Sequence, residues 1–199
     1  MFSEHVQSRA EQRASTETQV LAAADRLFRE QGYEATTVRA IAAAAGVSAG
    51  TVMSVGDKAR LLIHIFDGRI RTIHEERAAA PAGTWGSVVD EVVALVEPFV
   101  SYFTTDLGLA REYASVLVRG THDSAVFTEL ALHLVGELAQ TLERAGLDAE
   151  RAARGAGALY YLYLGVLMAA SSGALDHDAA VQQFRSSVQF AIDSNGDHA

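Results

Sequence analysis

Several hydroxyl-bearing residues around a glycine form the segment of this sequence best suited to binding an anion. Between positions 36 and 58 they are Thr36, Thr37, Ser48, Thr51 and Ser54. Hydroxyl groups, and the free N–H groups at the start of a helix, both donate hydrogen bonds to phosphate oxygens. The segment therefore indicates contacts with a phosphate backbone rather than bond-breaking chemistry.

Residue types that serve catalysis and metal binding are present, but not in the patterns that those functions use. His74-Glu75-Glu76 lacks the second histidine of a zinc-protease helix, and Asp176-His177-Asp178 is explained by caps in a turn between helices. The sequence contains no cysteine and no glycine-rich phosphate loop. We therefore expect no enzyme activity, no catalytic residue, no metal and no cofactor.

Two short helices joined at Gly46 are predicted to position the hydroxyl groups. The first runs from about residue 37 to 45, and Ser48 can cap a second that runs to about residue 55. A small polar residue at the start of the second helix leaves its first turn free to enter a major groove. The pattern predicts a helix-turn-helix that binds DNA; the alternative is a helical corner within a bundle.

Helical periodicity dominates the remaining sequence, so the predicted fold class is all-α. Thr16 and Gln19 form a capping box that would open the first helix, and Gly32 would end it. Later helices are expected at about 57–79, 87–105, 107–119, 124–145, 148–172 and 177–194. The prediction is about nine helices, divided into an N-terminal arm (1–15), a three-helix helix-turn-helix domain (16–66) and a C-terminal helical bundle for ligand binding and dimerisation (67–199).

Together with the helix upstream, the segment resembles the N-terminal domain of the TetR (tetracycline repressor) family of regulators. The residues that carry the likeness, over about positions 16–66, are Gly32-Tyr33, Thr36-Thr37-Val38, Ile41-Ala42, Ala45-Gly46-Val47-Ser48, Gly50-Thr51 and Lys58. One departure follows Gly50-Thr51, because Val52-Met53-Ser54-Val55-Gly56 stands where the family usually has an aromatic residue, then a basic residue or histidine, then phenylalanine.

The resemblance implies two sets of DNA contacts. Bases or backbone would be contacted by Ser48, Ala49, Gly50, Thr51, Met53 and Ser54, and phosphates by Thr36, Thr37, Arg39 and Lys58. The predicted recognition helix has no arginine or asparagine for a bidentate base contact, so readout would depend on methyl contacts, water and DNA shape. Most of the net charge of −9 lies beyond residue 74, which leaves the N-terminal part nearly neutral.

Aromatic residues in the C-terminal part are candidates for an effector pocket, since tyrosine combines an apolar ring with a polar tip. The candidate lining is Phe99, Tyr102, Phe103, Tyr113, Phe127, Leu130, Tyr160, Tyr163, Leu164 and Leu167. The alternative is a solid aromatic core without a pocket. The expected ligand is a small hydrophobic molecule.

The stretch from Ala156 to Ala170 is apolar on every side of a helix, which suggests that a second copy covers part of it. The predicted dimer interface consists of Ala158, Gly165 and Ala169 on this helix and of Val181, Phe184, Val188 and Ile192 on the last helix. The alternative is a core helix of a monomer. The stretch is shorter than the ~20 residues that span a bilayer, and the polar N-terminus does not resemble a signal peptide, so we expect a cytoplasmic protein without a membrane partner.

These patterns predict a ligand-responsive transcriptional repressor. It would bind a palindromic double-stranded DNA operator as a homodimer and be released by a small hydrophobic effector. The alternative is a helical small-molecule-binding or protein-interaction dimer with weak or lost DNA binding, suggested by the missing aromatic and histidine residues after Gly50-Thr51.

Overall fold

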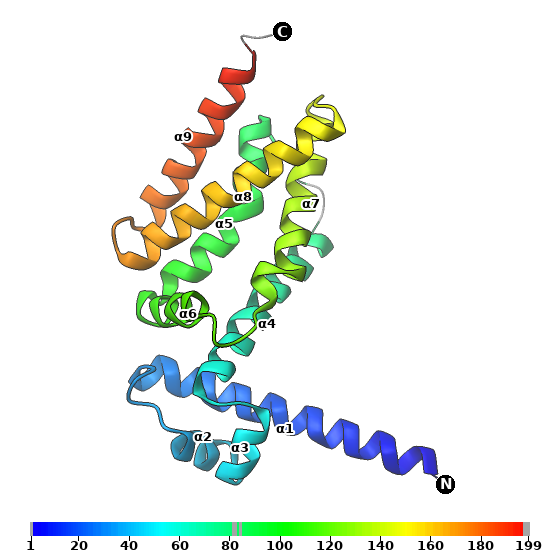
Figure 1. The fold of residues 1–199 in the computed structure, drawn as a ribbon, viewed down its shortest axis with the longest axis vertical. Coiled ribbons are helices and arrows are strands. Elements are labelled where there is room, and N and C mark those ends of the chain that lie inside the picture. Colours follow the sequence, from blue (N-terminus) through cyan, green and yellow to red (C-terminus); the bar gives the residue numbers. More distant parts are fainter. Residues whose placement is uncertain (1, 81–82, 84, 197–199) are drawn as a thin grey trace.

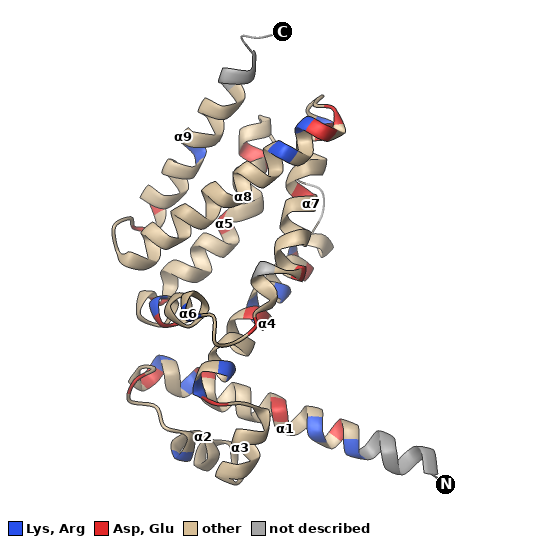
Figure 2. Cartoon of the chain, in the orientation of Figure 1, with Lys and Arg blue, Asp and Glu red and all other residues tan. Residues whose placement is uncertain are grey.

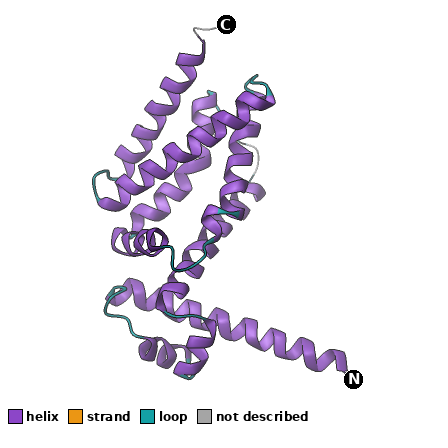
Figure 3. Ribbon diagram, viewed as in Figure 1, coloured by secondary structure: helices purple, strands orange, loops and turns teal. Residues whose placement is uncertain are grey.

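The computed structural model describes residues 2–80, 83 and 85–196. Within this part the chain is all α, with nine α-helices and no strand, as the sequence predicts (Figures 1 and 3). The helices are α1 (Phe2–Gln31), α2 (Val38–Ala45), α3 (Ala49–Val55), α4 (Lys58–Ala79), α5 (Val88–Thr105), α6 (Leu107–Arg119), α7 (Glu129–Arg144), α8 (Ala149–Ser172) and α9 (His177–Gly196), with a 3-10 turn η1 (Ala125–Phe127) before α7.

Side-chain caps define the helices of the N-terminal unit. Thr37, Ser48 and Asp57 each accept a hydrogen bond from the backbone N–H three residues later, at the starts of α2, α3 and α4. Gly46 ends α2 with a φ of 67°, a left-handed conformation that suits glycine because it has no Cβ. These local signals fix the sharp turn between α2 and α3.

A small apolar core holds α1, α2 and α3 together. Val20, Phe28, Ile41 and Val52 are buried, with at most 1% of each residue exposed. Since Val52 is the buried residue of α3, it anchors one side of that helix and leaves the opposite side to solvent.

The first helix begins earlier than predicted. It starts at Phe2, and Thr16 lies inside it with its hydroxyl donating to the carbonyl oxygen of Gln12 at 2.8 Å. The predicted capping box at Thr16 is therefore wrong. Residues 3–15 contain no glycine or proline and are rich in glutamate, glutamine, alanine and arginine, which favour helix over a cap.

The C-terminal unit is a helical bundle in which α8 packs against α5, α6, α7 and α9. Its core is apolar, and Phe99, Leu138, Ala156 and Phe184 are almost fully buried. By length and composition α8 is the one described helix that could cross a membrane, and the bent helix pairs α2–α3 and α5–α6 also pass that test together. In this fold one side of α8 is covered by its neighbours in the bundle.

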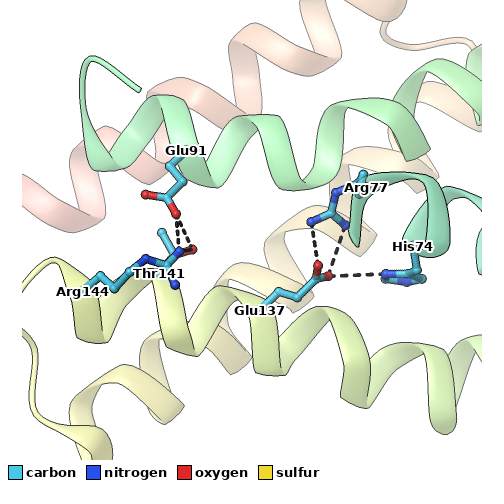
Figure 4. A network of polar contacts seen from close by, with 6 residues as sticks. All are labelled: His74, Arg77, Glu91, Glu137, Thr141 and Arg144. Atoms are coloured by element: carbon cyan, nitrogen blue, oxygen red, sulfur yellow. Dashed lines mark hydrogen bonds and ion pairs between the residues drawn. The ribbon is translucent and has the colours of Figure 1, made fainter. Parts of the chain in front are cut away.

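The long helix α4 belongs to both units: it follows α3 directly and then runs alongside the bundle (Figure 1). The predicted boundary between residues 66 and 67 lies inside it. Near its end, Arg77 donates two hydrogen bonds to Glu137 of α7, at 2.9 and 3.1 Å, and His74 Nδ1 lies 3.4 Å from the same carboxylate (Figure 4). A second ion pair, Arg144 with Glu91, joins α7 to α5 in the same figure.

His74, Glu137 and His133 lie close enough together to be considered as metal ligands, with candidate ligand atoms within 4.8 Å of one another. Both carboxylate oxygens of Glu137, however, already accept hydrogen bonds from the Arg77 guanidinium. A cation placed there would face that positive charge at close range. We therefore interpret the cluster as an ion pair that joins α4 to α7.

Replacing Glu137 by glutamine is expected to lower the free energy of unfolding by about 2–3 kcal/mol, because it leaves Arg77 without its anionic partner. Burial tends to raise the pKa of Glu137, but His74 and Arg77 outweigh it and hold the pKa below its ordinary value of 4.5. A carboxylate with a lowered pKa stabilises the fold above its ordinary pKa, and that contribution is lost as the pH falls through the folded-state value.

Urea titrations at several pH values check this prediction. The difference between wild type and Glu137→Gln should be largest near neutral pH and shrink below about pH 4. Glu91→Gln is the matched control, since its partner Arg144 has a side chain that is 59% exposed and the loss should stay below about 1 kcal/mol. Equal effects of the two variants at every pH would contradict this account of the ion pair.

Candidate functional site

The exposed side of α3 is the first candidate surface. The capping residue Ser48 and the helix residues Ala49, Gly50, Met53 and Ser54 are exposed, and Met53 has 53% of its surface free. Thr51 is half-buried beside them. The predicted base-contacting residues are therefore brought together at one outward-facing surface, at the end of the molecule furthest from the bundle (Figure 1).

Hydrogen bonds hold the polar side chains of this surface in place. Ser48 Oγ accepts from the N–H of Thr51 at 3.0 Å and lies 2.9 Å from the Thr51 hydroxyl, while the Ser54 hydroxyl donates to the Thr51 carbonyl oxygen at 2.7 Å. A hydroxyl has one donor and two acceptor positions, so each retains capacity for an external partner. The surface is polar and ordered, but α3 itself carries no charge.

The four predicted phosphate contacts divide into two groups. Thr37 and Arg39 are exposed at the start of α2, as a phosphate contact requires. Thr36 is only 1% exposed, and its hydroxyl bonds with the carbonyl oxygens of Gly32 at 2.8 Å and Leu27 at 3.2 Å. The prediction for Thr36 is therefore wrong, because the hydroxyl is needed to satisfy backbone groups at the end of α1.

Lys58 is also engaged within the chain. Its ammonium group donates to the carbonyl oxygen of Tyr33 at 2.9 Å, approaches that of Glu34 at 3.4 Å, and lies 4.2 Å from the centre of the Tyr33 ring. These contacts tie the start of α4 to the loop after α1. The structure gives Lys58 an internal positioning role, and a phosphate contact by Lys58 would compete with these bonds.

A second candidate site is a pocket of about 300 Å³ between α6 and α8. Five of the ten predicted residues line it: Phe103, Tyr113, Tyr163, Leu164 and Leu167. The sequence prediction missed the remaining lining, which is Ala114, Leu117, Val118, Val126, Gly165, Met168 and Ser171. The apolar spacing of Tyr113, Leu117 and Val116 on α6 marks an amphipathic helix, but it does not show which residues border a space.

The other predicted pocket residues lie elsewhere. Phe99 and Leu130 are buried in the core, and the Tyr160 hydroxyl donates to the carbonyl oxygen of Val126 at 3.1 Å. Tyr102 borders a different hollow, between α1, α4 and α5. None of these four residues lines the pocket between α6 and α8. The Phe127 side chain lies outside the described residues.

Tyr113 connects the pocket to α4. Its hydroxyl donates to Asp67 Oδ1 at 2.9 Å, and its ring stacks on Phe66 with centroids 4.2 Å apart. Asp67 also accepts from the Ser124 hydroxyl and from the N–H of Ala125, each at 2.7 Å. Burial and the neighbouring Asp67 raise the pKa of Tyr113 well above its ordinary value, so the phenol remains a proton donor.

Ser124 and Ala125 belong to the segment that connects α6 to α7, residues 120–125, and this segment also contacts the beginning of α4. His122 Nε2 lies 3.0 Å from Asp57 Oδ2, while Asp57 Oδ1 accepts from the N–H of Arg60 at 2.8 Å. Burial opposes ionisation of Asp57, but hydrogen bonds from the Arg60 N–H and from His122 outweigh it, so the pKa of Asp57 lies below its ordinary value. Two carboxylates, Asp57 at the N-cap of α4 and Asp67 within α4, therefore contact one segment of the C-terminal unit.

An exposed stripe along α8 is a candidate dimer surface. Ala158, Tyr161, Gly165 and Met168 recur at intervals of three and four residues, and all four are exposed, Tyr161 by 74% and Met168 by 51%. Ala169 beside them is half-buried. An exposed apolar face of this kind marks a surface that another molecule can cover.

The prediction for α9 is only partly compatible with the structure. Phe184 and Val188 are 0% exposed and belong to the chain's own core, so their assignment to the dimer interface is wrong. Val181 and Ile192 are half-buried against that core. The amphipathic pattern of α9 identified a buried face correctly, but the face packs on α5 and α8 of the same chain.

Comparisons with known proteins gave a match to the helix-turn-helix segment and similarities to the fold of most of the chain. A family profile described as "Bacterial regulatory proteins, tetR family" matches residues 20–54, which include α2 and all but the last residue of α3. A sequence comparison with curated proteins gave no significant match. A TetR transcriptional regulator from Rhodococcus sp. RHA1 is structurally similar with a TM-score of 0.65 and 20% identity, covering 90% of this chain and 96% of that one.

Two further solved structures share the fold. NalD of Pseudomonas aeruginosa, described as the secondary repressor of the MexAB-OprM multidrug efflux pump, has a TM-score of 0.51 and 20% identity, covering 89% and 95% of the two chains. The SmeT–triclosan complex has a TM-score of 0.54 and 21% identity, covering 89% and 91%. Over residues 20–54 the chain thus matches the tetR family profile, and over most of its length its fold is similar to that of solved TetR-type regulators.

Proposed function

We propose that this protein is a cytoplasmic, ligand-responsive repressor that binds a palindromic DNA operator as a homodimer and has no enzymatic activity. The observation that carries the proposal is the shared use of α4. This helix begins directly after α3, and it also bears Asp67, which holds Tyr113 at the pocket. A ligand and a DNA duplex would therefore act on one rigid element.

DNA would be read by the exposed side of α3. In the proposed complex, Ser48, Ala49, Gly50, Thr51, Met53 and Ser54 contact base edges or backbone, and Thr37 and Arg39 contact phosphates. The N–H groups at the capped starts of α2 and α3 suit phosphate oxygens. The functional division at residues 16–66 and 67–199 remains part of this proposal, with α4 shared between the two parts.

The effector is proposed to be a small, neutral, hydrophobic molecule. No charged side chain occurs among the described residues that line the pocket, and its polar groups are the hydroxyls of Tyr113, Tyr163 and Ser171. A charged ligand would lose its hydration there without gaining a counter-ion. The bound triclosan of the SmeT complex, a relative by fold, supports a ligand of this class.

Release from DNA would follow from displacement of Tyr113. A ligand that presses on this ring also presses on Phe66 and Asp67, and so on the orientation of α4 and α3. The ligand must bind the released state more tightly, and a shift from 1:99 to 99:1 would need about 5.5 kcal/mol of difference. The Tyr113–Asp67 contact is therefore the proposed coupling element.

The dimer is proposed to form through the exposed stripe of α8. Ala158 and Gly165 would allow close approach of a partner helix, while Tyr161 and Met168 would supply apolar area. Two copies related by a two-fold axis would present two α3 helices to a palindromic site.

A second candidate function keeps the ligand and the dimer but not the DNA. It is favoured by the uncharged α3 and by the internal contacts of Lys58. Titration with duplex DNA from the region upstream of its own coding sequence separates the two functions.

Replacing Met53 by glutamate is expected to weaken DNA binding about 10- to 100-fold, because it places a negative charge at the surface that faces the duplex. Leu132→Glu is the matched control, since Leu132 is 75% exposed on α7 and the charge change is identical. Fluorescence anisotropy with duplex DNA measures both. Equal affinities of the two variants, or no binding by the wild type, would contradict repression by α3 and favour the second candidate.

Replacing Ala114 by tryptophan is expected to fill the pocket and abolish binding of neutral aromatic probes, triclosan among them. Calorimetry measures probe binding, and anisotropy measures DNA affinity with and without the probe. The DNA affinity of the variant should be the same with and without the probe. Unchanged probe affinity in Ala114→Trp would remove the pocket from the proposal.

Replacing Gly165 by arginine is expected to convert the dimer to a monomer, because a long charged side chain would lie between the two α8 helices. A Cβ at Gly165 meets no atom within 4 Å, so the protomer itself should fold normally. Gly136→Arg on α7 is the control, since a Cβ there is equally unobstructed. Sedimentation velocity at micromolar concentration measures the state; a wild type that sediments as a monomer would refute the interface.

A further inference from the structure

In the proposed DNA complex, α3 itself brings no positive charge to the duplex. Residues 48–55, which include α3, carry no basic side chain, and the Lys58 ammonium is bonded to the carbonyl oxygens of Tyr33 and Glu34. Neutralisation of phosphates by lysine and arginine supplies most of the non-specific affinity of DNA-binding proteins. If α3 enters a groove, the charge must come from residues around it.

A large hollow beside α3 contains such residues. It has a volume of about 820 Å³ and is bordered by one face of α1 between residues 9 and 17, by α3 residues between 51 and 55, by the first turns of α4 and by His122. Arg9 and Arg13 lie on its α1 side, one helical turn apart on the same face, and Arg60 lies on its α4 side. All three arginines are exposed.

Within the part of the chain that the structure describes, these three guanidinium groups have no anionic partner. Over the described residues, no carboxylate lies within ion-pair distance of Arg9, Arg13 or Arg60. By contrast, Arg26 and Arg29, further along the same helix, pair with Glu30 and Asp25 at 3.1 and 2.9 Å. The N-terminal half of α1 therefore keeps its positive charges available.

Two acidic residues also border the hollow, and each has a contact elsewhere in the chain. Asp57 caps α4 and contacts His122, and Glu17 lies 3.9 Å from His64. Arg60 is held close by, since a Cβ on Gly56 would come within 2.9 Å of the Arg60 Cβ. Glycine at position 56, which is part of the departure from the family pattern, thus leaves room for the Arg60 side chain.

The position of α1 fits a strand of DNA. Its N-terminal half projects beyond the body of the molecule at the end that carries α3, with basic and acidic residues alternating along the projecting part (Figures 1 and 2). A phosphate backbone bordering the groove that α3 enters would run through the hollow between them. Arg9, Arg13 and Arg60 all lie outside the segment matched by the family, residues 20–54.

We propose that Arg9 and Arg13 of α1 and Arg60 of α4 form a cradle for the sugar-phosphate backbone of double-stranded DNA beside α3. This inference rests on the proposed DNA-binding function and deepens it, because it assigns the phosphate contacts that α3 and Lys58 do not provide. The cradle contributes affinity rather than sequence preference, since phosphates are the same at every base pair.

The test is the salt dependence of DNA binding by the full-length chain. The logarithm of the association constant falls with the logarithm of salt concentration, with a slope of about −0.9 for each phosphate neutralised. Arg9→Gln with Arg13→Gln should reduce the magnitude of that slope by about 2 and weaken binding equally on the upstream duplex and on a duplex of shuffled sequence. Arg60→Gln should reduce it by about 1.

Two further double variants separate phosphate contacts at the cradle from the effect of the protein's net charge. Arg151→Gln with Arg154→Gln changes the net charge identically at exposed positions of α8 and should leave the slope unchanged. Arg9→Lys with Arg13→Lys keeps two cations in place and should retain most of the wild-type slope. Circular dichroism checks that α1 keeps its helical content in each variant.

The outcomes separate DNA binding by α3 from phosphate contacts by the three arginines. A wild type that binds neither duplex contradicts both the proposed function and the cradle. In a second outcome, Met53→Glu weakens DNA binding, but the salt-dependence slope of Arg9→Gln with Arg13→Gln equals that of the α8 control. This result would keep the proposed function and overturn the cradle. A reduced slope confined to the α1 and α4 variants supports it.

Discussion

The buried carboxylate of Asp67 is the interaction on which the proposed coupling depends. It is 8% exposed and accepts three hydrogen bonds, from the Tyr113 hydroxyl, the Ser124 hydroxyl and the Ala125 N–H. A buried carboxylate is tolerated only where donors replace its water, so α4, α6 and the segment before α7 are held in one relative position. Because Tyr113 also lines the pocket, whatever moves this ring disturbs that arrangement.

The charge distribution explains how an acidic protein can approach DNA. The net charge of −9 resides mainly in the C-terminal unit, and the exposed side of α3 is neutral. An acidic body remote from the duplex does little harm at physiological salt, where interactions beyond about 8 Å are screened. Local, unpaired cations then matter more than the total, and the first half of α1 is where the structure keeps them.

Much of the fold could be predicted from local signals in the sequence. Ser48 caps α3 and Gly46 turns the chain as expected, and α2 and α4 begin within one residue of the predicted positions, because these effects depend on residues within one helical turn. Thr16 fails as a cap for the same kind of reason, since its neighbours favour helix on both sides. Helix propensity and capping within one turn therefore decide where these helices begin and end.

The candidate sites were less predictable, because they depend on how helices pack. Phe184 and Val188 look like an interface from periodicity alone, which cannot distinguish a face buried by the same chain from one buried by another. Likewise, Thr36 and Lys58 match a family pattern, yet their polar atoms bond to the carbonyl oxygens of Gly32 and Tyr33. Contacts between residues far apart in sequence decide such cases, and no motif reports them.

The proposed function requires two α3 helices of one dimer to meet the same face of a DNA duplex. Hydroxyl-radical footprinting of the complex with upstream duplex DNA measures this arrangement. We expect two protected regions on one face of the duplex, with centres about 10 base pairs or a multiple of that apart. A single protected region, or uniform protection along the duplex, would contradict it.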